Sequence, residues 1–167
     1  TQLMGVVKIY SLKASSTTSY APNSITFQLN AVISYQYDGK QYEIWAQNVM
    51  LYNTETHNLV FVDNLWNFTS LHANITGVEG SGNISVADIR SHYITFYYDY
   101  AKTPGSNITV SLPAEIMLLS NVTTNLKGEP VLCFWYNDGY GWQKYDEVTI
   151  ANAPGSTNVY FHIDGYN

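Results

Sequence analysis

Acidic side chains are the residues of this chain that best suit hydrolytic chemistry. Two carboxylates that share one proton can activate a water molecule with one group and protonate the reacting bond with the other. The Asp-Thr-Gly or Asp-Ser-Gly pattern of pepsin-like proteases is absent, although Asp38, Asp138 and Asp164 each precede a glycine. Asp38 and Asp138 fit hairpin turns better than a catalytic site, because Asp-Gly is a favoured turn pair.

Other reactive residue types give weaker signals. The histidines, at positions 57, 72, 92 and 162, lack a metal-ligand spacing, and no serine lies in a Gly-x-Ser-x-Gly elbow. Cys133 is the only cysteine and is interpreted as a small buried hydrophobe. We expect no metal and no cofactor. Large aromatic residues can form a sugar-binding platform, but the core is the commoner place for the four tryptophans: Trp45, Trp66, Trp135 and Trp142.

Neutral polar residues replace charges over most of this chain. Charged residues make up 12% of the 167 positions, against about 25% in an average soluble domain, while there are 15 tyrosines. A fold that depends on few ionised carboxylates loses little when acid protonates them, so the composition is compatible with an acidic environment. The net charge of −6 and the lack of a basic cluster argue against nucleic acid as a partner.

Five Asn-x-Ser/Thr sequons indicate a secreted or cell-surface protein. No apolar run approaches the roughly 20 residues needed to cross a bilayer. The chain begins at Thr1 rather than Met, as expected after removal of a signal peptide. Glycosylation requires surface positions, and the sequence predicts N-linked glycans at Asn67, Asn74, Asn83, Asn107 and Asn121.

Alternation of apolar and polar residues predicts an all-β fold. The longest series places every second residue from 25 to 37 on one face of a strand, and Asp38-Gly39 then predicts a hairpin turn. Asn137-Asp138-Gly139 predicts a second hairpin. Further strands are expected at residues 58–62, 71–78, 93–100, 107–112 and 158–163. We therefore predict an antiparallel β-sandwich of short strands and hairpins, with residues 24–167 as the main domain.

Residues 1–23 form a separate N-terminal strand and polar linker in this interpretation. The strand either completes its own domain or leaves it and adds to a neighbour's sheet. The second alternative predicts self-association through residues of the segment 3–12, namely Leu3, Met4, Val6, Val7, Ile9, Tyr10 and Leu12.

Several short patches resemble the thermopsin family, which comprises secreted, acid-stable archaeal proteases of aspartic type. They occur over residues 24–150, in the family's order, as Phe-Gln-Leu-Asn from position 27, Trp-Ala-Gln-Asn-Val from 45, Asp-Asn-Leu-Trp-Asn-Phe-Thr from 63, Gly-Ser-Gly from 80, Tyr-Tyr-Asp from 97 and Tyr-Asp-Glu-Val from 145. The resemblance implies a thermoacidophilic archaeal source and a secreted all-β fold. It marks Asp63 and Asp146 as the carboxylates to test.

Two functions remain open on this sequence. The resemblance covers the first part of thermopsins, which continue into a Gly-rich region that is not found here. This difference and the sequons favour a non-catalytic, glycosylated filament subunit of the cell surface, assembled by donation of the N-terminal strand. The alternative is an acid-active, thermopsin-like aspartic-type endopeptidase, or a fragment of one, in which Asp63 and Asp146 form the catalytic pair.

Overall fold

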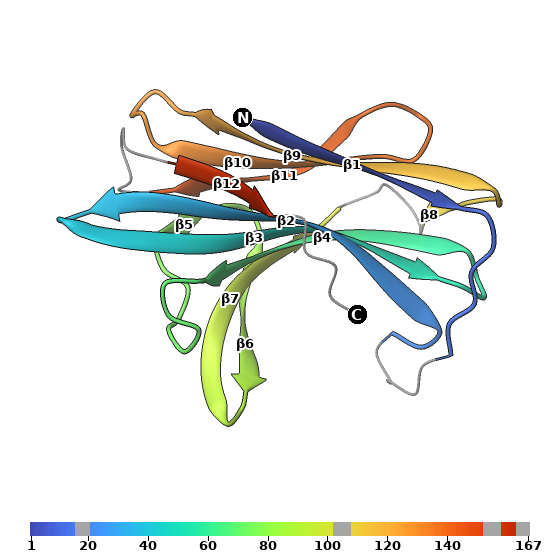
Figure 1. Ribbon diagram of the computed structural model, residues 1–167, viewed down its shortest axis with the longest axis horizontal. Coiled ribbons are helices and arrows are strands. Elements are labelled where there is room, and N and C mark those ends of the chain that lie inside the picture. The colour runs from blue at the N-terminus through green and yellow to red at the C-terminus, as the bar shows by residue number, and fades with distance from the viewer. Residues whose placement is uncertain (16–20, 102–107, 152–157, 163–167) are drawn as a thin grey trace.

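The computed structural model describes residues 1–15, 21–101, 108–151 and 158–162. Within them the chain forms two antiparallel sheets that pack face to face, which confirms the predicted β-sandwich (Figure 1). The strands are β1 (Gln2–Ile9), β2 (Ser24–Tyr37), β3 (Lys40–Asn53), β4 (Asn58–Asn67), β5 (Val78–Glu79), β6 (Asn83–Ile89), β7 (His92–Tyr100), β8 (Ile108–Thr109), β9 (Ala114–Thr124), β10 (Pro130–Asn137), β11 (Gln143–Ile150) and β12 (Asn158–His162). One sheet has the order β1-β9-β10-β11-β5 and the other β12-β2-β3-β4-β7-β6, with β8 paired to β4.

The hairpin β2–β3 is the longest regular unit of the seven-stranded sheet. Its ladder runs without a register shift from Ser24 opposite Asn53 to Tyr37 opposite Lys40. Asp38 and Gly39 both have positive φ, 49° and 71°, which is the backbone of a type I′ turn. This turn matches the twist of the two strands, and it confirms the hairpin predicted from Asp38-Gly39.

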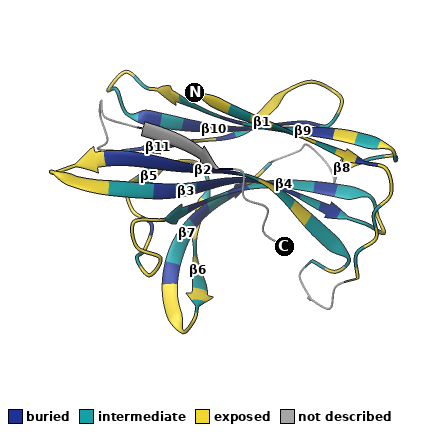
Figure 2. Cartoon of the chain, viewed as in Figure 1, coloured by how far each residue is buried: buried dark blue, intermediate teal, exposed yellow. Residues whose placement is uncertain are grey.

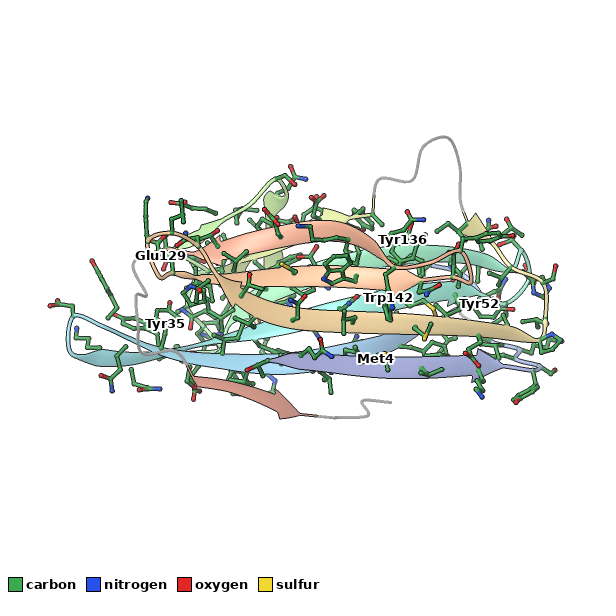
Figure 3. The ribbon with its side chains drawn as sticks, turned by 90° about the horizontal axis from the view of Figure 1, so that it is seen from above. Met4, Tyr35, Tyr52, Glu129, Tyr136 and Trp142 are labelled. Atoms are coloured by element: carbon green, nitrogen blue, oxygen red, sulfur yellow. The ribbon has the colours of Figure 1, made fainter. Side chains whose placement is uncertain are left out.

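The N-terminal strand completes the five-stranded sheet of its own molecule. β1 pairs with β9 from Gln2 opposite Asn121 to Ile9 opposite Ala114. The inward-facing apolar residues of β1 pack in the core of this same chain: Ile9 is 4% exposed, and Val7 packs against the same cluster. The outward residues of the segment remain exposed, among them Val6, Tyr10 and Met4, of which Met4 is labelled in Figure 3.

Two apolar clusters fill the space between the sheets. One includes Ile33, Leu65 and Phe134, and the other includes Met50 and Phe61. Buried residues of both sheets contribute to each cluster, which is why the dark segments of Figure 2 face one another. Cys133 is buried as predicted.

The strand predictions were wrong in four places. Residues 71–78 alternate like a strand but form turns, and only Val78 and Glu79 pair. The expected strand at 107–112 is reduced to the two residues of β8. β6 and β9 were not predicted at all. The β6–β7 hairpin bends away from the sandwich (Figure 1), and its tip is exposed (Figure 2).

Ion pairs contribute little to this fold. In the described part of the chain two salt bridges occur, Lys8 with Glu115 and Lys144 with Glu147, and both are largely exposed. Exposed pairs of this kind stabilise a protein by less than about 1 kcal/mol. No helix in the described residues is long and apolar enough to span a membrane.

Candidate functional site

A row of polar side chains crosses the inner face of the seven-stranded sheet. Asn48 on β3 lies opposite Asp63 on β4, and Asp63 lies opposite Asp99 on β7. The three side chains therefore share one face, and each is at most 4% exposed. The row separates the two apolar clusters, because Ala46 and Met50 flank Asn48 on the same face of β3 and belong to different clusters. Buried polar groups require hydrogen-bond partners, and for Asn48 these come from the opposite sheet.

A bulge in the five-stranded sheet supplies those partners. The register of β10 against β11 shifts after Phe134, which lies opposite Asp146, so that Trp135 lies opposite Lys144. Tyr145 is the extra residue of this bulge. A regular strand sends adjacent side chains to opposite faces, whereas a bulge can direct two neighbours to one side. Tyr145 and Asp146 both reach the interior here, where each bonds to a residue of the other sheet.

Asn48 joins the two sheets through its side-chain amide. Its Nδ2 donates to the carbonyl oxygens of Leu119 at 2.9 Å and Trp135 at 3.1 Å, while its Oδ1 accepts a 2.8 Å hydrogen bond from the Tyr145 hydroxyl. Both amide protons and the amide oxygen are thus satisfied. The Trp135 carbonyl is one of these acceptors and lies at the bulge. Asn48 therefore fixes the position of the bulge relative to the acidic row.

The turn Gly80-Ser81-Gly82 closes one end of the row. Ser81 Oγ donates to Asp99 Oδ2 at 2.9 Å, and the Gly82 N–H donates to the Tyr97 hydroxyl at 2.8 Å. A Cβ at either glycine would overlap the Tyr97 ring or hydroxyl. Only glycine permits this approach of the backbone to Tyr97.

Asp63 and Asp146 form a coupled pair of carboxyl groups. Burial, and then the charge of Asp146, raise the pKa of Asp63 to about 9, so Asp63 keeps its proton far above the usual range. Its Oδ1 accepts the Asp99 N–H at 3.2 Å. No hydrogen-bond partner of its Oδ2 is seen in the described residues, and the neighbouring Asp146 contributes to the raised pKa of Asp63. The surroundings of Asp63 therefore favour its protonated form.

Asp146 is the member of the pair that retains charge more readily. Burial raises its pKa too, but hydrogen bonds from Tyr97 and Asp63 oppose the rise. The Tyr97 hydroxyl donates to Asp146 Oδ2 at 2.8 Å, and the Glu147 N–H donates to Oδ1 at 2.8 Å. Burial keeps the pKa of Tyr97 raised, so this hydroxyl remains a donor. Their different environments thus favour the charged form at Asp146 and the protonated form at Asp63.

A surface cleft of about 420 Å³ lies beside Asp146, the less buried member of this pair. Glu79, Gly80 and Ser81 line one side, and residues 144–147 with Thr149 line the other. Asp146 borders the cleft, whereas Asp63 does not line it and is 0% exposed. Asp146 is consequently the carboxyl of the pair nearer to solvent.

Comparison with known proteins identifies the family. A sequence model described as Thermopsin matches residues 1–167. The chain belongs to the thermopsin family. Thermopsin of Sulfolobus acidocaldarius is 32% identical over 90 residues, which cover 52% of this chain and 26% of that protein. The chain thus aligns with about a quarter of its thermopsin relative. No solved structure matches the chain.

Membership of the thermopsin family corrects the function favoured by the sequence. The interpretation as a filament subunit that donates its N-terminal strand is wrong: the family match and the thermopsin relative favour the alternative, proteolytic reading. In this chain β1 pairs with β9 of its own sheet. The assembly role suggested for residues 3–12 is replaced by a place in the core for the inward-facing members, of which Ile9 is the most buried.

Five of the six patches that resemble the thermopsin family contribute residues to the acidic row or to its partners. Asp63 and Asp146, the carboxylates selected from the sequence, lie together although they are far apart in the chain. Asp38 lies in a hairpin turn, Asp138 in the β10–β11 turn, and Asp164 outside the described residues. Sequence reasoning quoted the patches but assigned no role to the other members of the site: Asn48, Ser81, Tyr97, Asp99 and Tyr145.

The predicted glycosylation positions differ in their surroundings. Asn74 and Asn83 are exposed, whereas Asn67 and Asn121 are half-buried, and Asn107 lies outside the described residues. Asn121 Oδ1 accepts a 2.7 Å hydrogen bond from the Trp135 indole, and Asn67 Nδ2 donates to the Asn74 carbonyl at 3.3 Å. Asn83 is the most open of these positions because no side-chain hydrogen bond is seen for it in the described residues.

Proposed function

We propose that this chain acts as an acid-active endopeptidase of the aspartic type. The observation that carries the proposal is the coupled pair Asp63 and Asp146, which the two sheets contribute from opposite sides. A buried pair that shares one proton has the chemistry of a general acid and a general base at a single site. The name of the relative, thermopsin, and the family membership support the same reading.

The geometry supports a mechanism with divided roles. The Asp146 carboxylate takes a proton from a water molecule in the cleft while the water oxygen attacks the carbonyl carbon of a peptide bond. The Asp63 proton passes by way of the Asp146 carboxyl, which borders the cleft, to the carbonyl oxygen, and this produces a neutral tetrahedral diol. The diol then collapses as its C–N bond breaks: the proton taken up from water passes from Asp146 to the departing amine nitrogen, and a hydroxyl proton returns to Asp63 by the same route. One carboxyl proton thus remains at the end, as at the start.

The proposal is tested by cleavage of acid-denatured haemoglobin across the pH range 2–7. Asp63→Asn and Asp146→Asn keep the size and shape of each side chain but remove its acid–base function. Each is expected to lower kcat by about a hundredfold to ten thousandfold. Asp88→Asn is the matched control, because Asp88 is an exposed carboxylate on β6 and outside the row.

The outcome is read together with the fold of each variant. Circular dichroism spectra that match the wild type exclude unfolding as the cause of a loss of activity. The proposal fails if purified wild-type protein cleaves nothing at any of these pH values. It also fails if Asp63→Asn and Asp146→Asn are both as active as Asp88→Asn.

We further propose that the chain works outside a thermoacidophilic archaeal cell and carries N-linked glycans. The scarcity of charge and the exposed sequons at Asn74 and Asn83 support this proposal. Mass spectrometry of peptides from the natively expressed protein is expected to find glycan mass at Asn83 first. Unmodified Asn74 and Asn83 peptides would contradict it.

A further inference from the structure

We propose that a polypeptide substrate binds as an added β-strand along the open edge of β11. The inference rests on the proposed function for its chemistry and adds the mode of substrate recognition. The starting observation is the length of β5, which pairs only two residues, Glu79 and Val78, with Thr149 and Ile150. In the described part of the chain no strand pairs with the outer edge of β11 from residue 143 to residue 148. Unpaired edges of this kind are templates for strand addition.

The cleft lies where β5 leaves this edge. After Glu79 the chain turns inward, because Ser81 bonds to Asp99 and the Gly82 N–H bonds to Tyr97. The space that this turn opens is the cleft of about 420 Å³ between residues 79–81 and residues 144–147. An extended chain placed beside β11 would occupy this space.

The same edge carries the proposed base. Asp146 lies in β11 and borders the cleft. Neighbouring strands of a sheet lie about 4.8 Å apart, so a strand added beside residues 144–147 would pass within reach of the Asp146 carboxyl. Strand addition therefore brings a peptide carbonyl to the base without a dedicated side-chain pocket.

The lining of the cleft favours recognition of the main chain. Its lining carries Lys144 and Glu147, which already pair with each other, and two further acidic residues, Glu79 and the proposed base Asp146. The glycine and serine of the opposite rim present little side chain. A cleft with these walls suits the backbone of an unfolded polypeptide better than an anionic or strongly apolar ligand. The occupant we infer is an extended segment of a denatured protein.

Amide hydrogen exchange tests the binding mode independently of cleavage. The Asp63→Asn variant is mixed with oxidised insulin B chain at pH 3, where asparagine resembles the protonated carboxyl that it replaces. Exchange of the amides of residues 143–147 is expected to slow by about tenfold or more. β1 is the internal control, because it forms the other edge of the same sheet and lies away from the cleft. Slowed exchange only at β1, or no change at β11 with saturating peptide, overturns the inference.

Backbone methylation of a substrate peptide provides the second test. A peptide spanning a bond that the wild-type enzyme cleaves is N-methylated at one amide at a time. Strand addition predicts loss of cleavage at every second position, because alternate amides face the partner strand. A pattern without this period overturns the inference while leaving proteolysis established. Protection of β11 with no cleavage by the wild type would instead refute the proposed function and retain the binding mode.

Discussion

Two regions of the sandwich interior differ in what holds them together. In the apolar cluster at one end, the Phe61 and Tyr136 rings stack with centroids 4.1 Å apart, and no buried charge is involved. One step along β4 from Phe61 on the same face, Asp63 is equally buried but lies against another carboxyl. Apolar packing does not depend on proton concentration, whereas the acidic row is stable only while it holds a proton. The comparison separates the part of the core that supports the fold from the part that can do chemistry.

The largest expected effect is the pH dependence of stability. The pKa of Asp63 rises from an ordinary value of 3.8 to about 9 in the folded chain. Between these values the folded protein binds more protons than the unfolded protein, so the free energy of unfolding falls as pH rises. The stabilisation is complete below about pH 4 and is lost as pH rises to about 9. The total is at most about 7 kcal/mol, because one pKa unit corresponds to about 1.4 kcal/mol.

Thermal unfolding between pH 3 and pH 9, followed by circular dichroism, measures this slope. The wild type is expected to melt at the highest temperature in acid. Asp63→Asn should flatten the curve, since an amide does not titrate, and Asp88→Asn should leave it unchanged. A wild-type protein that is more stable at pH 8 than at pH 4 would show that the acidic row does not control stability.

The apolar region should respond to mutation equally at every pH. Phe61 is 1% exposed, and Phe61→Ala removes a stacked ring and leaves a cavity. A loss of about 3–5 kcal/mol in the free energy of unfolding is expected. Urea denaturation at pH 4 and pH 8 should give the same loss within error. A loss confined to one pH would mean that the two regions are coupled through the row, contrary to the comparison.

The sequence predicted the local features of this fold better than the long-range ones. The β2–β3 hairpin follows from alternation and from Asp38-Gly39, which are visible within a few residues. Residues 71–78 have similar alternation, yet they turn because Asn74 caps the Thr95 N–H and Gly77 has a positive φ of 72°. β9 was missed because its Ala-Glu-Ile-Met-Leu-Leu run has no strict alternation, and tertiary pairing with β1 and β10 decides its state.

The candidate site shows the same division. Asp63 and Asp146 were selected through family patches, but the sequence contains no local sign that they touch. Their proximity depends on the packing of two sheets and on the bulge at Tyr145. The alternation of apolar and polar residues in β11 does not predict this bulge. Asp99 and Asn48 join them only because three strands align in register. The signal that was available, and was not used, is that five of the six patches, all but the one that begins at Phe27, carry a polar or aromatic residue of the site.

The smallest predicted effect concerns Tyr97, which we expect to position and tune Asp146. Its hydroxyl donates to the Asp146 carboxylate, and a hydrogen bond to the charged form of an acid lowers its pKa. Tyr97→Phe removes that bond, so the pKa of Asp146 should rise. The carboxylate form would then exist only at higher pH. The acid limb of the kcat/KM profile should move toward higher pH.

Tyr145→Phe is the matched control, because it removes a hydroxyl from the neighbouring end of the row. The Tyr145 hydroxyl donates to the amide of Asn48 rather than to a carboxylate. Its loss should therefore reduce stability by about 1 kcal/mol and leave the acid limb in place. Equal shifts of the acid limb in the two variants would show that the limb depends on the packing of the whole row rather than on the hydrogen bond to Asp146. A shift in Tyr97→Phe alone would assign the limb to Asp146, because only there does the missing hydroxyl stabilise the charge that the reaction uses.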